Sequence, residues 1–153
     1  MNAIDLLKIV VQDLAMSVAG KIRVFISHAS DDLWVAQQIS NCIEGLGAST
    51  FLDRRDIAKG DNFRQIIRRE IEACDELLAL FTPWSHRRTW LHHELGMADI
   101  LGKRLVCVFY QVQLKDFDAN GEGRGVFDEM NIVEINDLPA YFMELQGRIR
   151  TSR

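Results

Sequence analysis

The sequence has little of what several protein classes require. It holds only three cysteines, Cys42, Cys74 and Cys107, which lie far apart within apolar segments. An odd number of scattered cysteines argues against a disulfide framework and indicates reduced thiols, packed as small hydrophobic side chains in a cytoplasmic protein. Positive charge is also scarce, since 18 Lys and Arg against 22 Asp and Glu give a net charge of -4. We expect no nucleic-acid partner, because phosphate binding needs concentrated Lys and Arg.

Long uncharged apolar runs are missing as well. The first 20 residues come nearest, but Asp5, Lys8 and Asp13 interrupt them, so we expect no membrane span. The apolar side chains of this segment recur at helical spacing and predict an amphipathic helix over residues 1–20. Its apolar stripe could pack on the domain, on a second copy, on a partner or on a membrane surface. The stripe consists of Ile4, Leu7, Val11, Leu14 and Val18.

From residue 21 onward, short apolar runs alternate with stretches of helical periodicity, without repeats or low-complexity segments. Apolar runs of this kind are typical of strands that helices cover on both faces. The pattern predicts an α/β fold, a flavodoxin-like doubly wound sheet of five mostly parallel strands, as one domain over residues 21–150. The expected strands are 22–27, 48–53, 76–81, 104–111 and 131–135, and the expected helices are 31–46, 61–74, 87–101 and 138–150.

The stretch VFISHASDD, residues 24–32, changes from apolar to polar where the first strand is expected to end. Ligands of open parallel sheets bind beyond the carboxyl ends of the strands, so Ser27 and His28 lie at the expected ligand edge. Ser30, Asp31 and Asp32 have a simpler interpretation, because these residue types cap helix N-termini.

The residues at this edge argue against two other doubly wound folds. A dinucleotide-binding Rossmann domain needs G-x-G-x-x-G after its first strand, and this chain has no glycine there. The glycine cluster GEGRG, residues 121–125, follows the fourth expected strand and opens no helix. A phosphoreceiver domain needs an acceptor aspartate at the end of its third strand, where this chain has FTPW.

Three segments together resemble the sequence boxes of a bacterial-type Toll/interleukin-1 receptor (TIR) domain. They are VFISHASDD, FLDRRDIAKGDNF and SHRRTWLHHELGMA, on the first expected strand, the loop after the second strand and the helix after the third. The resemblance covers residues 21–142. It implies the TIR fold and, because many TIR domains cleave NAD⁺, an enzyme that uses NAD⁺ as a substrate and needs no cofactor.

The motif Trp-x-x-x-Glu places Trp90 and Glu94 four residues apart, on one face of the expected helix. The family's catalytic glutamate falls on Glu94. One carboxylate is enough for this chemistry, because nicotinamide leaves NAD⁺ as a neutral molecule and needs no acid, unlike the alkoxide of most glycosidases. Trp90 offers a flat ring on which a nucleotide could stack, most strongly the cationic nicotinamide. Ser27 and His28 are further candidate substrate contacts.

Residues 53–63 resemble the loop through which TIR domains contact each other and gate the substrate cleft. Asp53 ends the second expected strand and could bind a ribose hydroxyl. The positive charges of the loop could meet an acidic partner surface or a pyrophosphate, and a glycine frees the chain to turn into the next helix. The candidate loop and interface residues are Arg54, Arg55, Lys59, Gly60 and Asp61.

A metal site beside Glu94 is not expected. His92 and His93 are adjacent, and neighbouring helical residues point about 100° apart, so their rings cannot share a ligand face. The segment also lacks the histidine pair four residues apart that a zinc-binding helix carries.

The resemblance implies an NAD⁺ glycohydrolase activated by TIR–TIR association into a homo-oligomer or filament. Two alternatives stay open: a scaffold or adaptor that acts by TIR–TIR association alone, and a nucleoside deoxyribosyltransferase-like enzyme for another N-glycoside. The intact Trp-x-x-x-Glu motif favours an enzyme, because an adaptor has no chemical need for Glu94. The sequence leaves open whether the product is linear, cyclic or conjugated ADP-ribose, and whether the role is antiphage defence or that of an effector.

Overall fold

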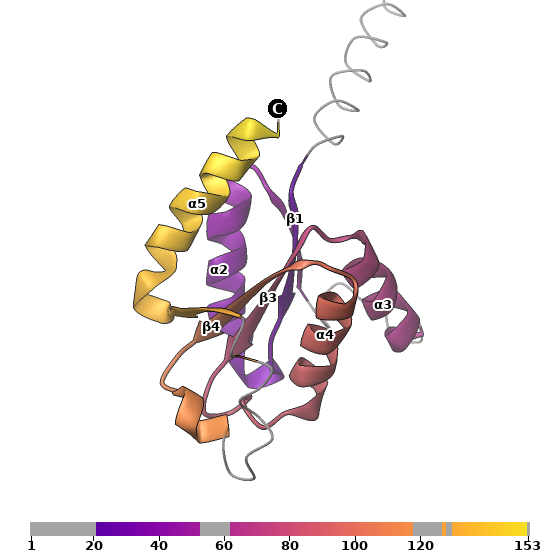
Figure 1. Cartoon of the computed structure of the whole chain (residues 1–153), viewed down its shortest axis with the longest axis vertical. Coiled ribbons are helices and arrows are strands. Elements are labelled where there is room, and N and C mark those ends of the chain that lie inside the picture. Colours follow the sequence, from indigo (N-terminus) through magenta and orange to yellow (C-terminus); the bar gives the residue numbers. More distant parts are fainter. Residues whose placement is uncertain (1–20, 53–61, 118–126, 128–129, 153) are drawn as a thin grey trace, which may run out of the picture.

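The described residues form a five-stranded sheet with helices on both sides (Figure 1). The strands are β1 (Arg23–Ser27), β2 (Ser49–Leu52), β3 (Glu76–Phe81), β4 (Arg104–Phe109) and β5 (Asn131–Glu134). The α-helices are α2 (Leu33–Gly45), α3 (Phe63–Ala73), α4 (Thr89–Ile100) and α5 (Leu138–Thr151), and the 3₁₀ turns are η1 (Ser30–Asp32), η2 (Leu114–Phe117) and η3 (Ile135–Asp137). This computed structural model describes residues 21–52, 62–117, 127 and 130–152.

The strand order is β2-β1-β3-β4-β5, and every neighbouring pair is parallel. This order confirms the predicted flavodoxin-like sheet, which is parallel throughout. The chain moves from β1 to β2 on one side and then crosses back to β3 on the other side. The carboxyl ends of β1 and β3 therefore form the point at which ligands of such sheets bind.

The two faces of the sheet are covered by two pairs of helices, α2 with α5 and α3 with α4 (Figure 1). Successive side chains of a strand point to opposite faces. On β1, Val24 and Ile26 pack on the side of α2 and α5, whereas Phe25 packs on the side of α3 and α4. Helices cover both faces of the sheet, which explains why the sequences of the central strands are continuous apolar runs. In the described part of the chain, no helix is long and apolar enough to cross a bilayer.

Several predicted boundaries are corrected by the structure. The strand expected at residues 104–111 ends at Phe109, and two residues later Gln111 has a positive φ of 56°, which a strand does not accommodate. The helix expected at 31–46 begins at Leu33, after a 3₁₀ turn. Cys42 is exposed on α2, so the prediction that all three cysteines are packed is wrong for this one, although Cys74 and Cys107 are buried.

Helix α5 is attached to the sheet through a buried carboxylate. Glu76, the first residue of β3, is 1% exposed and accepts hydrogen bonds from the Tyr141 hydroxyl at 2.5 Å and the Arg148 guanidinium at 2.8 Å. Arg104 lies 3.6 Å from the same carboxylate. These contacts lie at the amino edge of the strands, opposite the ligand edge, so we regard them as structural.

Candidate functional site

Ser27 and Glu94 meet at the carboxyl edge of the sheet. Ser27 is the last residue of β1, and its hydroxyl donates a hydrogen bond to Oε2 of Glu94 on α4. Both side chains are buried, with exposed fractions of 0% and 2%. Burying a carboxylate is unfavourable unless hydrogen bonds replace lost water, so this bond offsets part of that cost.

Glu94 is buried because of its position on α4. Leu91, Leu95 and Ala98 form the stripe of this helix that faces the sheet, and Glu94 falls within the same stripe. Such positions normally carry apolar residues. A carboxylate in this position is therefore unusual, and the spacing of the apolar residues alone could have revealed its burial.

Trp90 lies one helical turn before Glu94 and is partly buried. Its ring stacks on Phe63, the first residue of α3, with ring centroids 4.9 Å apart and planes 29° from parallel. Phe63 covers one face of Trp90, so a ligand that stacks on this face must displace Phe63. Sequence reasoning missed Phe63, although it ends the second TIR-like segment.

A small depression adjoins Trp90. Its volume is about 120 Å³, well below the roughly 300–1,000 Å³ of typical small-molecule sites. This depression alone is too small to hold a whole nucleotide ligand. The depression is lined by Ala29, Ser30, Arg88, Thr89, Trp90 and Leu91.

His28 was predicted as a substrate contact, and the structure places it next to Ser27 but inside the protein. It is 1% exposed, and its Nδ1 lies 3.4 Å from the carbonyl oxygen of Ile26. In this conformation it borders the site without presenting its ring to a ligand.

The capping role expected for Ser30, Asp31 and Asp32 is wrong. Neither η1 nor α2 has a side-chain cap, and Asp32 instead accepts a 2.8 Å hydrogen bond from the Thr82 hydroxyl in the loop after β3. The Ser85 hydroxyl accepts a 2.8 Å bond from the Thr82 amide, which closes this turn. Asp32 thus connects the ends of β1 and β3, a link between residues 50 positions apart that no local pattern reveals.

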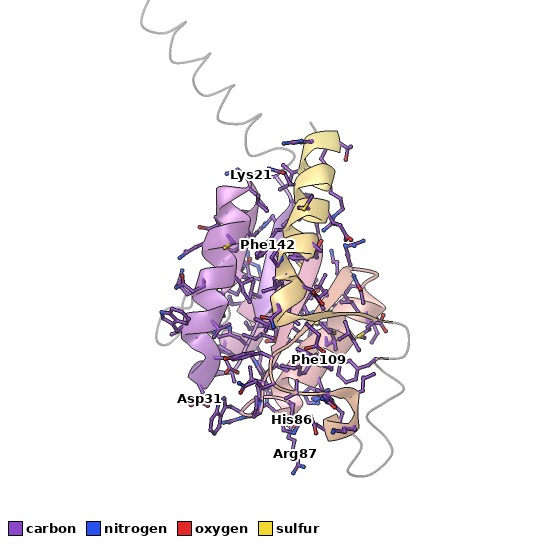
Figure 2. The ribbon with its side chains drawn as sticks, turned by 90° about the vertical axis from the view of Figure 1, so that its left-hand side faces the viewer. Lys21, Asp31, His86, Arg87, Phe109 and Phe142 are labelled. Atoms are coloured by element: carbon purple, nitrogen blue, oxygen red, sulfur yellow. The ribbon has the colours of Figure 1, made fainter. Side chains whose placement is uncertain are left out.

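Burial raises the pKa of Asp32 above its ordinary value, while hydrogen bonds from Thr82 and Ser85 act in the opposite direction. Asp31 is exposed and lies 3.5 Å from Arg88 in a surface ion pair. Such pairs contribute little to stability. Figure 2 shows Asp31, His86 and Arg87 at the end of the molecule opposite Lys21, where the strands have their carboxyl ends.

The sequence model of the TIR domain matches residues 24–134. The chain belongs to the TIR domain family. The matched region contains the Ser27–Glu94 contact, Trp90 and the turn held by Asp32, so the geometry described above belongs to the TIR domain itself. No curated protein matches the chain.

Three solved structures illustrate the fold of this TIR domain. The TIR domain of the Toll-related receptor TRR-2 from Hydra magnipapillata has a TM-score of 0.65 at 21% identity, covering 83% of this chain and 97% of that chain. The TIR domains of the activated Roq1 resistosome have a TM-score of 0.56 at 18% identity, covering 86% and 83%. The CMP N-glycosidase BcmB from Clostridium botulinum has a TM-score of 0.52 at 17% identity, covering 80% and 96%. At these identities the likeness shows the fold alone.

The side chains of His92 and His93 of the TIR domain lie in different surroundings. His92 lies 2.8 Å through Nε2 from the carbonyl oxygen of His86, and its ring packs against Phe81 and other phenylalanines, whereas His93 is exposed. Within the described ranges, no group of three His, Cys, Asp or Glu side chains could hold a metal ion.

The loop predictions fall outside the described residues. The roles assigned to this loop, in binding a ribose and in contacting a second TIR domain, therefore stay predictions. The predicted helix at residues 1–20 and the glycine cluster at 121–125 lie outside the described residues as well. The loop residues concerned are Asp53, Arg54, Arg55, Lys59, Gly60 and Asp61.

Proposed function

We propose that this TIR domain is an NAD⁺ glycohydrolase that cleaves the bond between nicotinamide and ribose. The observation that carries the proposal is the buried carboxylate of Glu94, which a buried hydroxyl holds at the ligand edge, one turn from an aromatic ring. We infer that the carboxylate of Glu94 is retained for chemistry, because it occupies a position in the buried, otherwise apolar stripe of α4.

The reaction needs one anionic group next to the ribose. As the bond between C1′ and the pyridinium nitrogen breaks, the electron pair goes to the nitrogen and neutral nicotinamide departs. The positive charge that develops on the ribose is stabilised by the carboxylate of Glu94, whose effect is strengthened where water is excluded. Water then adds to C1′ and loses a proton, which gives ADP-ribose. If a hydroxyl group or a ring nitrogen attacked C1′ of the ribose cation in place of water, the product would be conjugated or cyclic ADP-ribose.

The remaining substrate contacts follow from the depression beside Trp90. The ring of Trp90 would stack on a nucleotide ring, and Arg88 and Ser30 would meet phosphate oxygens. His28 would border the ribose, and Asp53, outside the described residues, would bind one of its hydroxyls.

Access to Glu94 requires a rearrangement. The carboxylate is 2% exposed, so a substrate reaches it only after neighbouring side chains move. In our account a second TIR domain binds through the loop at residues 53–61 and drives this change, which also excludes water. The activity of the cytoplasmic protein would then depend on assembly into a homo-oligomer or filament. TIR domains are also assembled in the Roq1 resistosome.

A second substrate class has one observation in its favour. BcmB is a CMP N-glycosidase with the same fold, so a nucleotide N-glycoside other than NAD⁺ is an alternative for the same carboxylate. A scaffold without chemistry is the remaining alternative. Under that alternative neither compound is cleaved, even by the assembled protein.

Incubation with NAD⁺, and separately with CMP, at high protein concentration tests the proposal. Chromatography should detect nicotinamide and an ADP-ribose species from NAD⁺ and no cytosine from CMP. A dilution series followed by light scattering should show activity per molecule falling as the assembly dissociates. Charge reversal at Arg54 and Arg55 should remove the dependence on concentration. Constant activity from a protein that stays monomeric would exclude the assembly mechanism.

A further inference from the structure

Helix α4 exposes apolar side chains, beside His93 and Asp99, on the side that faces away from the sheet. Its inner stripe is buried, but Ile100 is 88% exposed and Leu101, which follows the helix, is 42% exposed. Met97 lies on the same outer side. A cluster of exposed apolar side chains is often the docking site of another segment. Helix α3 differs, because its outer side carries charged residues such as Arg68 and Arg69.

The outer side of α4 and the adjacent side of α3 enclose a largely apolar groove of about 550 Å³. Arg68 and Glu72 form one rim and pair with each other at 2.9 Å, so their charges are already matched. The opposite helix pair, α2 and α5, exposes Trp34 and Met143. The groove is lined by Arg68, Glu72, His92, His93, Gly96, Met97, Ile100 and Leu101.

The N-terminal segment joins the domain at the end of this groove. Arg23, the first residue of β1, bonds through its guanidinium to Glu70 of α3 at 3.0 Å. Lys103, just after α4, bonds to the carbonyl oxygen of Glu72 at 2.8 Å. The start of β1 and the C-terminal ends of α3 and α4 therefore meet at one edge, the end at which Figure 2 shows Lys21.

The segment also has the right length and pattern. The helix that the sequence predicts over residues 1–20 would be about 30 Å long, and the 12 residues of α4 extend about 18 Å at 1.5 Å per residue. A segment attached at the end of the groove can therefore run along its whole length. Its apolar stripe, from Ile4 to Val18, would cover the exposed apolar side chains on the outer side of α4.

We propose that residues 1–20 dock in the groove between α3 and α4 of the same chain, with the stripe on Met97, Ile100 and Leu101. A tethered segment has an effective concentration on the order of millimolar at such a site. This advantage favours the chain's own segment over a second copy. The docked segment would span the two helices that carry Phe63, Trp90 and Glu94. The proposal does not depend on NAD⁺ cleavage.

Cross-linking of paired cysteines tests the docking. In the full chain with Cys42→Ser, which removes the exposed thiol, Leu14→Cys is combined with Met97→Cys in the groove. The matched control combines Leu14→Cys with Met143→Cys on α5, a methionine that is 75% exposed on the opposite face. Thermal unfolding checks that each variant is folded, and a short bis-maleimide is the probe.

The Met97 pair should give a cross-link of monomer mass, at least about tenfold faster than the Met143 pair, with a yield that does not change on dilution. Covalent dimers that disappear on dilution would assign the groove to a second copy and overturn the proposal. Equal rates for the two pairs, or no cross-link in the folded Met97 variant, would overturn it too.

Discussion

The hydroxyl of Ser27 and the carboxylate of Glu94 form a buried hydrogen bond across 67 residues of sequence. The bond connects the end of β1 to the inner side of α4. In our account Ser27 acts through Glu94 as a positioning residue, in addition to bordering the substrate. This relationship couples the two TIR-like segments that sequence reasoning had treated as separate parts of the site.

Replacing Ser27 by alanine should lower kcat for NAD⁺ cleavage with little change in KM. A hydrogen bond to a charged group is worth about 1.5–3 kcal/mol, which corresponds to roughly 10- to 100-fold in rate. Ser40→Ala is the matched control, because Ser40 is also buried and bonds to Thr50 at 2.6 Å but lies away from the site. Steady-state kinetics of both variants provide the measurement. An unchanged kcat in folded Ser27→Ala would refute the positioning role.

Trp90→Ala should raise KM and lower kcat together, because a stacking surface acts on both the bound substrate and the transition state. An aromatic stack is worth about 0.5–1.5 kcal/mol beyond its buried area, so KM should rise by up to about tenfold. Trp90→Phe keeps a smaller ring, so its KM and kcat should fall between those of wild type and those of Trp90→Ala. A wild-type KM in folded Trp90→Ala would count against stacking.

The fold could be predicted because its central strands are buried on both faces. The apolar runs of β1 and β3 needed no knowledge of tertiary contacts, and their boundaries were predicted to within a residue. The predicted end of the fourth strand was wrong, because Gln111 has a positive φ that the sequence pattern does not indicate. Glu94 was found from the family resemblance, and its burial follows from its place between Leu91 and Leu95.

The contacts that hold the site together could not be predicted from the sequence. Asp32 has the residue type and position of a helix cap, and only the fold brings the hydroxyl of Thr82 to its carboxylate. Phe63 likewise reaches Trp90 only because α3 and α4 lie side by side on one face of the sheet. Contacts between distant segments depend on how helices pack, and local periodicity carries no information about that packing.

The titration of Asp32 should appear in the pH dependence of stability. Burial raises its pKa above the ordinary value of 3.8, and Asp31 adds to the effect while Arg88 opposes it. The folded state therefore binds more protons than the unfolded state between these two pKa values, so stability decreases as pH rises through this window. Asp32→Asn removes this titration.

The free energy of unfolding of Asp32→Asn minus that of wild type should therefore increase as pH rises above 3.8, and level off once Asp32 is ionised in the folded protein. Urea unfolding of both proteins at a series of pH values measures the difference. A constant difference would show that Asp32 does not titrate with a raised pKa.

Arg148→Ala should destabilise the protein much more than a surface charge deletion. It removes the closest cation of buried Glu76, and breaking such a pair costs about 3 kcal/mol, at the low end of its range because Arg104 stays within 3.6 Å. Arg68→Ala, which breaks an exposed pair on α3, should cost less than about 1 kcal/mol. Urea unfolding gives both values. Similar costs for the two variants would show that the buried network is not important for stability.

The most direct test of the account is the rate of nicotinamide release from NAD⁺ by wild type and Glu94→Gln at the same high protein concentration. Glutamine has nearly the same shape as glutamate, and its amide oxygen can accept the hydrogen bond from Ser27, so thermal unfolding should confirm a folded variant. Because the variant lacks the charge that stabilises the ribose cation, we predict release from wild type and a loss of at least about 100-fold in Glu94→Gln. Release at the wild-type rate by folded Glu94→Gln would contradict the account.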